Sequence, residues 1–250
     1  MRIALLGDVH GNADALEAVV RSIAAEKPDL VVCLGDSVGF YSHPSDCLRM
    51  VVESCQVIIA GDQDFLIGQS RPDALGGDAD ERAALQWTSE RLSEPEVAFL
   101  QQLPVQVCFS AGFAVVHGAF ADDSWLSGRI VPATLPENLR ALQGRNSPRV
   151  GFFGNSDRSF FSWMYEERST WGYLQGAEVY WPRGAEAVLI GPGSVGYPQD
   201  GDSRAAWGLV DLEERRFVVR RVEYDVERAA ASCRSAGLPA SLADRLISSR

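Results

Sequence analysis

The chain has 250 residues, 46% of them hydrophobic, which is enough to bury one sizeable core. Its 34 acidic and 23 basic residues give a formal net charge of −11, which argues against nucleic-acid backbones and anionic membranes as partners. No run approaches the roughly 18 apolar residues of a membrane span, and the first residues lack a secretory-signal pattern, so we expect a cytoplasmic protein.

Short, β-branched apolar runs in the first part of the chain predict buried strands. They cover residues 2–6, 30–34, 56–60, 113–116 and 149–153. Their length and continuous apolar character suit strands that are buried on both faces. Between the first two runs, apolar residues at helical spacing predict a helix over 14–25, with Asn12 available as its N-cap. The chain therefore begins with a strand–helix–strand unit.

The later segments predict a mixed sheet system. Acidic residues at the start of 78–91 favour a helix there, since they complement the helix dipole. After a further strand at 187–190, the apolar runs 206–212 and 217–222 are separated by four residues only, which is typical of a hairpin. The last residues, 226–250, predict one or two polar helices.

No linker-like stretch, fixed repeat or charge run divides the sequence, so we expect one domain over residues 1–250. The five cysteines show neither CxxC pairs nor zinc-finger spacing, and we interpret them as reduced thiols.

Polar clusters follow five of the predicted strands directly. In chain order they contain Asp8 and His10, Asp36, Asp62 and Asp64, His117, and Asn155 and Asp157. Loops at the carboxyl ends of parallel strands converge on one crevice, so these side chains are expected to meet in space. Two of the three histidines of the chain lie in these clusters.

These clusters resemble the ordered motifs GDxH, GDxxG, GNHD, GH and GHxH of the calcineurin-like metallophosphoesterases, as found in bacterial members. The matching segments are GDVH at 7–10, GDSVG at 35–39, GDQD at 61–64, HG at 117–118 and GNSD at 154–157. The stretches 39–47 and 191–207 also look like segments of that family. The resemblance implies an α/β fold, a four-layer αββα sandwich of two mixed β-sheets flanked by helices, with two divalent metals at the strand ends.

Carried over position by position, the resemblance gives two ligand sets that share Asp36. The first set is Asp8, His10, Asp36 and Asp157, and the second is Asp36, Asp62, His117 and Asn155. Three positions depart from the family pattern, since Asp62 replaces an Asn, and Asn155 and Asp157 replace two histidines. All three offer oxygen donors, which favours manganese or magnesium over iron or zinc. Alternatively, these three residues are ordinary turn formers.

The third motif also differs at the position that donates a proton in the family. Gln63 occupies that position, followed by Asp64, which orients the donor in the family. An amide forms hydrogen bonds but cannot act as a general acid. His43 and Arg158 lie in or next to the motif loops and are candidates for substrate contact, although a surface role is the simpler interpretation of each.

Two functions remain open at this point. The first is a metal-dependent phosphoester hydrolase with reduced or changed activity on a phosphorylated substrate. The second is a catalytically inactive binding or scaffold protein of the same fold, favoured by Gln63 and by the loss of both GHxH histidines. The oxygen or nitrogen donors at all seven ligand positions favour the enzyme.

Overall fold

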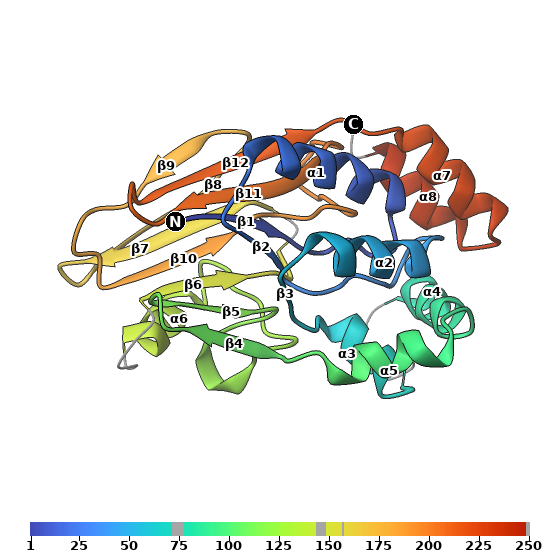
Figure 1. Cartoon of the computed structure of the whole chain (residues 1–250), viewed down its shortest axis with the longest axis horizontal. Helices are drawn as coiled ribbons and strands as arrows, with labels where there is room; N and C mark the ends of the chain where they lie inside the picture. The colour runs from blue at the N-terminus through green and yellow to red at the C-terminus, as the bar shows by residue number, and fades with distance from the viewer. Residues whose placement is uncertain (72–77, 144–148, 157, 249–250) are drawn as a thin grey trace.

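Two six-stranded mixed sheets pack face to face, with helices on their outer surfaces (Figure 1). The computed structural model describes residues 1–71, 78–143, 149–156 and 158–248. The first sheet has the order β3-β2-β1-β11-β12-β9. Its strands are β1 (Arg2–Leu6), β2 (Leu30–Cys33), β3 (Val57–Ile58), β9 (Glu178–Tyr180), β11 (Ala205–Asp211) and β12 (Arg216–Val222). Strands β1, β2 and β3 are parallel, whereas β11 pairs with β1 and β12 in antiparallel register.

The second sheet has the order β4-β5-β6-β10-β7-β8. Its strands are β4 (Gln106–Phe109), β5 (Phe113–Val116), β6 (Val150–Phe153), β7 (Phe160–Tyr165), β8 (Arg168–Tyr173) and β10 (Ala187–Gly191). Strands β5, β6 and β10 run parallel, and the others pair in antiparallel register. Each sheet therefore has a parallel part whose strand ends can present loops to a common site.

The core between the sheets follows from strand periodicity. In β1, Ile3 and Leu5 point toward the other sheet, where they join a cluster that includes Phe113 and Phe152. Ala4 and Leu6 point the other way and pack under helices. Because successive side chains of a strand alternate between faces, a strand with no polar residue needs a partner layer on each side. The continuous apolar runs of the sequence thus require four layers, as expected.

Helices supply the two outer layers. Helices α1 (Ala13–Glu26) and α2 (Pro44–Ser54) cover the first sheet, and α6 (Leu135–Gln143) covers the second. The remaining helices are α3 (Asp62–Gly68), α4 (Ala79–Ser89), α5 (Glu94–Gln102), α7 (Val226–Ser235) and α8 (Ala240–Ser248), with a 3₁₀ turn, η2, at Ala121–Asp123. Asn12 caps α1 as predicted, since its side chain accepts a hydrogen bond of 3.2 Å from the Ala15 backbone N–H.

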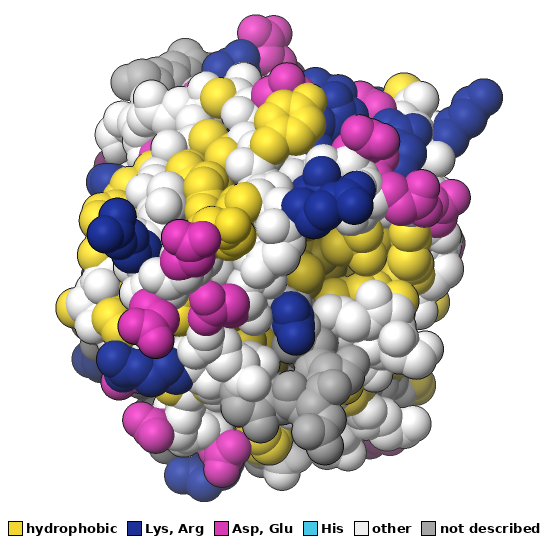
Figure 2. Space-filling view, turned by 90° about the vertical axis from the view of Figure 1, so that its left-hand side faces the viewer, with side chains coloured by type: hydrophobic (Ala, Val, Ile, Leu, Met, Phe, Trp, Pro, Cys, Tyr) yellow, Lys and Arg dark blue, Asp and Glu magenta, His cyan; other side chains and the backbone are white. Residues whose placement is uncertain are grey.

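Figure 2 looks onto the end of the molecule where β1 begins, on the left of Figure 1. Lysine or arginine and aspartate or glutamate side chains are interspersed on this face, among hydrophobic groups. Among the described residues, the helices are too short or too polar for any of them to cross a membrane.

The structure confirms the predicted β1 and β5 residue for residue, and the hairpin of β11 and β12. The strand expected over 56–60 is shorter, because only two of its residues pair with β2. The helix expected over 78–91 spans Ala79–Ser89, and the carboxyl-terminal segment forms two helices, α7 and α8. The sequence analysis missed strands β4, β7, β8 and β9 and helices α2, α3, α5 and α6.

Candidate metal centre

The loops that follow β1 and β2 are tied together by their backbones. The amide N–H groups of Val9 and His10 both donate to the Asp36 carbonyl, at 2.8 and 2.9 Å, and the Asp8 N–H donates to the Gly35 carbonyl at 3.0 Å. Asp8, His10 and Asp36 have φ angles of 53°, 53° and 54°, in the left-handed region that most residues avoid. The hydrogen bonds hold this strained backbone and so bring the three side chains together.

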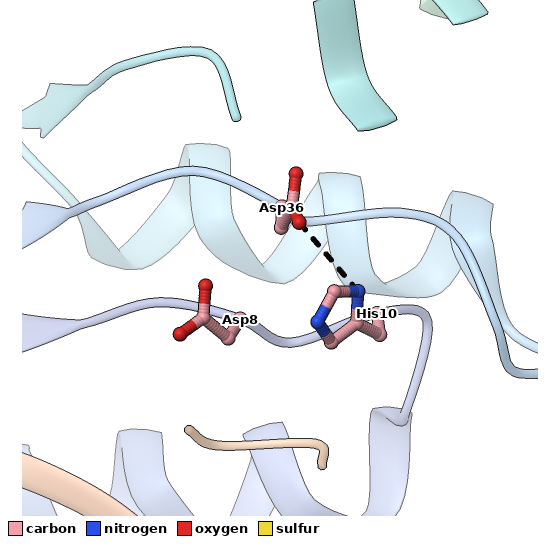
Figure 3. A group of neighbouring side chains, drawn as sticks. All are labelled: Asp8, His10 and Asp36. Atoms are coloured by element: carbon pink, nitrogen blue, oxygen red, sulfur yellow. Dashed lines mark ion pairs between the residues drawn. The ribbon is translucent and has the colours of Figure 1, made fainter. Parts of the chain in front are cut away.

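Two groups of three side chains come together at this strand end and have one member in common. The ligand atoms of Asp8, His10 and Asp36 lie within 4.8 Å of one another, and so do those of Asp36, Asp62 and His117. Figure 3 shows the first group, with the Asp8 and Asp36 carboxylates on either side of the space that the His10 ring faces. Asp62 is the first residue of α3, and His117 follows β5. Asp36 therefore lies between two candidate cation positions.

The His117 ring is oriented as a metal ligand requires. Its Nδ1 lies 2.7 Å from the Leu34 carbonyl oxygen, so this nitrogen carries a proton and donates it. Its Nε2 is buried, lies 3.5 Å from Asp36 Oδ2, and has no hydrogen-bond partner among the described residues. Although burial lowers the pKa of His117, the neighbouring carboxylates, Asp36 first among them, raise it well above its ordinary value. The surrounding carboxylates therefore favour a positive charge near Nε2, which a bound metal ion would supply.

His10 lies in a more apolar setting. Its ring stacks on Phe40 with the centroids 4.6 Å apart, and its Nδ1 lies 3.3 Å from the Gln63 amide oxygen. Burial lowers the pKa of His10 to about 3, an effect that the contact with Gln63 only partly opposes. His10 is consequently neutral at physiological pH, and its 3.8 Å approach to Asp36, the dashed line in Figure 3, is not a pair of full charges.

The carboxylates of the centre favour a bound cation. Burial, together with the Asp62 carboxylate, raises the pKa of Asp36 well above its ordinary value, against the opposing effect of His117. The Gln63 backbone N–H donates to Asp36 Oδ1 at 3.0 Å, which leaves Oδ2 facing the two imidazoles. Like charges this close are unfavourable without a compensating ion. The donor set and its buried Nε2 therefore fit divalent cations.

Asn155 lies next to Asp8 through its backbone. The N–H groups of Asn155 and Ser156 donate to the two oxygens of the Asp8 carboxylate, at 3.1 and 3.2 Å. The Asn155 side-chain amide donates to the Gly128 carbonyl at 3.4 Å, and its φ of 47° is again left-handed. Asp157, the remaining predicted ligand, lies outside the described residues. The structure thus places Asn155 at the cleft and leaves its role as a ligand a prediction.

Gln63 and Asp64 face different surroundings. Asp64 is fully buried, and its carboxylate accepts hydrogen bonds of 3.1–3.2 Å from the backbone N–H groups of Ser37, Val38 and Gly61. It therefore joins the loop after β2 to the start of α3. The Gln63 side chain lies over Gly39, where a Cβ would stand 1.8 Å from the amide oxygen. Because this position has no side chain, Gln63 reaches His10.

The centre opens into a cleft of about 170 Å³. Its lining residues are Asp8, His10, Asp36, Phe40, Gln63, Glu81, Arg129, Asn155, Tyr197 and Gln199. A second cavity, of about 190 Å³, shares Arg129, Asn155 and Gln199 with the cleft and is also lined by Arg158. His43 lines neither, since it precedes α2 and its Nδ1 lies 3.5 Å from Asp46 Oδ2. Contact of His43 with a substrate stays a prediction.

Five lining residues were missed by the sequence analysis, namely Phe40, Glu81, Arg129, Tyr197 and Gln199. Phe40 and Tyr197 belong to the stretches 39–47 and 191–207, whose family likeness was a usable signal. The loop of residues 194–196 lies against the β1 loop, where the Ser194 hydroxyl donates to the Asp8 carbonyl at 2.9 Å. Arg129 lies in a loop with no motif.

Known proteins resemble this chain in sequence and in fold. A profile described as calcineurin-like phosphoesterase matches residues 1–154. The uncharacterized protein MJ0912 of Methanocaldococcus jannaschii is 26% identical over 99% of this chain and 98% of its own length. The crystal structure of a metallophosphoesterase from Sphaerobacter thermophilus is 27% identical, covers 100% of both chains and superposes with a TM-score of 0.83. The hypothetical protein PH1004 of Pyrococcus horikoshii, 21% identical over 98% of this chain and 97% of its own, has the same fold with a TM-score of 0.77.

Proposed function

Because the chain belongs to the calcineurin-like phosphoesterase family, we propose that it is a phosphoester hydrolase with two divalent cations at an altered centre. One observation carries the proposal: two groups of carboxylate and imidazole ligands share Asp36. Between them they include a buried His117 Nε2 that lacks a protein partner among the described residues. A single bridging carboxylate is what a two-cation site needs.

The ligand sets are those of the family motifs, and the two groups of three side chains that share Asp36 support five of their seven members. Asp8, His10, Asp36 and Asp157 would hold one cation, and Asp62, His117 and Asn155 would join Asp36 around the other. Since five of the seven ligands are oxygen donors, manganese or magnesium is favoured over iron or zinc. When bound, such ions activate water and neutralise charge on the phosphoryl oxygens of the substrate.

The protein groups around the cations orient ligands and substrate. The Leu34 carbonyl fixes the His117 tautomer, and the Gln63 amide oxygen contacts the Nδ1 of His10 and so helps to orient its ring. Asp64 holds the loop of Asp36 against α3. Arg158, which lines the adjoining cavity, is the proposed contact for the phosphorylated substrate. Gln63 supplies no proton, so leaving groups that need protonation should react slowly.

A binding or scaffold function is the second candidate. The observation that favours it is Gln63, a neutral amide at the position of the family's proton donor. Both candidates predict metal binding, since both retain the ligands. They differ in turnover alone.

The test is hydrolysis of p-nitrophenyl phosphate by protein purified without chelators, with manganese added. We expect turnover that EDTA abolishes, and a loss of roughly 10³-fold in Asp36→Asn, because several kcal/mol of charge stabilisation depend on the bridging carboxylate. Asp244→Asn, which removes an exposed carboxylate on α8, is the matched control and should leave turnover unchanged. Metal binding without any turnover would favour the binding protein instead.

A further inference from the structure

We propose that a buried ion pair between Arg221 and Asp200 holds one loop against the metal cleft, and that Gln199 of this loop contacts a phosphoryl oxygen of the substrate. The inference rests on the proposed phosphoester hydrolase and adds a substrate contact and a positioning residue to it. All three residues lie after residue 154, in the part of the chain that the family profile does not match.

The loop between β10 and β11 is attached at its first end to the metal loop after β1. The Val195 N–H donates to the Gly7 carbonyl at 3.0 Å. The next N–H along the loop, that of Gly196, donates to the Asp8 carbonyl at 2.9 Å. This end of the loop is therefore fixed relative to the candidate ligand Asp8.

The other end of the loop is attached to β12 by the buried ion pair. The side chains of Arg221 and Asp200 are only 2% and 4% exposed, and one guanidinium nitrogen donates to the Asp200 carboxylate. A second nitrogen of Arg221 donates to the Arg204 carbonyl at 3.3 Å. A buried ion pair is held firmly, because separating the two charges leaves each of them without compensation. Arg221 thus fixes the loop at two points.

Gln199 lies between these two attachments. It lines both the cleft and the adjoining cavity. Its side chain is exposed and forms no hydrogen bond within the part of the chain that the structure describes. A side-chain amide offers two N–H donors, which suit phosphoryl oxygens. Because the backbone on either side of Gln199 is fixed, less conformational freedom is lost when this amide binds a ligand.

Arg220, the preceding residue of β12, provides a comparison within the same strand. It pairs with Glu26 of α1 at 2.5 Å, and its side chain is 42% exposed. Successive side chains of a strand point to opposite faces, so Arg220 faces α1 whereas Arg221 faces the loop. Two adjacent arginines therefore each form an ion pair, but only that of Arg221 holds a wall of the cleft.

The experiment measures kcat and KM for p-nitrophenyl phosphate in the manganese-loaded full chain. Gln199→Ala should raise KM by about tenfold and change kcat by less than about threefold, because a hydrogen bond to a charged group is lost from ground state and transition state alike. Arg221→Met should have the same effect, and the double variant should raise KM no further, since Arg221 acts through Gln199. Arg221→Lys keeps a cation beside Asp200 and should restore most of the wild-type KM.

Arg220→Met is the matched control, and its KM should stay within about twofold of wild type, since exposed ion pairs contribute little. Manganese affinity, measured by calorimetry, should be the same in all these variants. If thermal melts show that Arg221→Met is unfolded, Asp200→Asn takes its place, because it removes one charge of the pair from the loop instead of the strand.

An unchanged KM in Gln199→Ala, or additive increases in the double variant, would overturn the inference. A loss of manganese affinity in Arg221→Met would also overturn it, because the ion pair would then support the metal centre itself. If wild type hydrolyses no ester, the hydrolase proposal fails, and calorimetry with inorganic phosphate decides about the loop. Phosphate binding about tenfold weaker in Gln199→Ala and Arg221→Met than in Arg220→Met supports the inference. Equal binding in these variants, or no binding of phosphate by wild type, overturns it.

Discussion

The two ends of β1 carry charges of different kinds. At its carboxyl end, Asp8, His10 and Asp36 are buried, with exposed fractions of 4, 6 and 3%, and face one another. At its amino end, the Met1 ammonium pairs with Glu213 at 2.7 Å, and the nearby hairpin end carries the pair of Arg216 and Glu178. These pairs are largely open to water. Figure 2 shows this end, where both signs are interspersed, and Figure 3 shows the other.

The buried charged groups at the carboxyl end of β1 are suited to binding an ion, whereas the exposed pairs at its amino end have no such role. A buried cluster of carboxylates destabilises the fold unless a cation binds to it. The free-energy cost of burying these side chains is therefore offset only when the metal ion is bound. Exposed pairs contribute little, because water screens them. Substitutions at the carboxyl end of β1 should therefore change metal binding and turnover, and those at the amino end should change neither.

The largest expected effect concerns the leaving group in the cleft. Because Gln63 supplies no proton, p-nitrophenyl phosphate should be hydrolysed roughly 10²–10⁴ times faster than an alkyl phosphate such as glycerol phosphate. The measurement is kcat for both esters in the manganese-loaded protein. Similar rates would show that another group donates the proton, and His43 would be the first candidate to substitute.

A smaller effect is expected from a glycine that touches the bridging carboxylate. A Cβ at Gly61 would lie 2.0 Å from Asp36 Oδ1, although its φ of −87° suits any residue. Gly61→Ala should displace Asp36 and weaken manganese binding by about 10–100-fold, as loss of a group that orients a ligand does. Isothermal titration calorimetry with manganese measures this change in affinity.

Gly201→Ala is the control for Gly61→Ala, because it replaces a glycine without displacing a metal ligand. Gly201 has a φ of 83° and nothing within 4 Å of its added Cβ, so alanine there costs roughly 1 kcal/mol of stability and no metal affinity. Equal manganese affinities in wild type and Gly61→Ala would contradict the placement of Asp36.

Metal binding should also stabilise the folded chain. At a free manganese concentration of 100 Kd, each site adds about 2.7 kcal/mol to the free energy of unfolding. For a chain of this size that raises Tm by roughly 5–10 °C. Thermal melts with manganese and with EDTA provide the measurement, and coincident curves would mean that the buried carboxylates do not bind the ion.

The smallest effect is expected at the amino end of β1. Glu178→Gln removes the partner that lies 3.4 Å from Arg216, and both side chains are partly exposed. The change in Tm should be below about 2 °C, and manganese affinity should stay the same, since screened surface pairs contribute little. A loss of metal affinity in this variant would break the distinction between the two ends.

Much of the site could be predicted because the motifs lie at fixed points of a regular scaffold. Parallel strands end at one edge, so residues directly after β1, β2 and β5 must converge, and Asp8, Asp36 and His117 do. The order of these residues along the chain gave the family resemblance, which implied that Asp36 belongs to both ligand sets. To place these residues together, the sequence analysis needed only the correct position of each strand end.

The remaining parts depend on contacts that no local pattern encodes. Arg129 enters the cleft because the loop after β5 folds back, with Gly128 bonded to Asn155, far along the sequence. Gln63 reaches His10 only because Gly39 leaves room above it. Such contacts depend on the path of loops in three dimensions, whereas hydrophobic periodicity reports only which face of an element is buried.

Anomalous diffraction at the manganese edge, from crystals grown with manganese, tests the central claim most directly. Two peaks are expected, one within ligand distance of Asp8, His10 and Asp36 and the other of Asp36, Asp62 and His117, about 3.5–4 Å apart. The Asp36 carboxylate should lie between them. A single peak, or two peaks that do not share Asp36, would contradict the dinuclear centre.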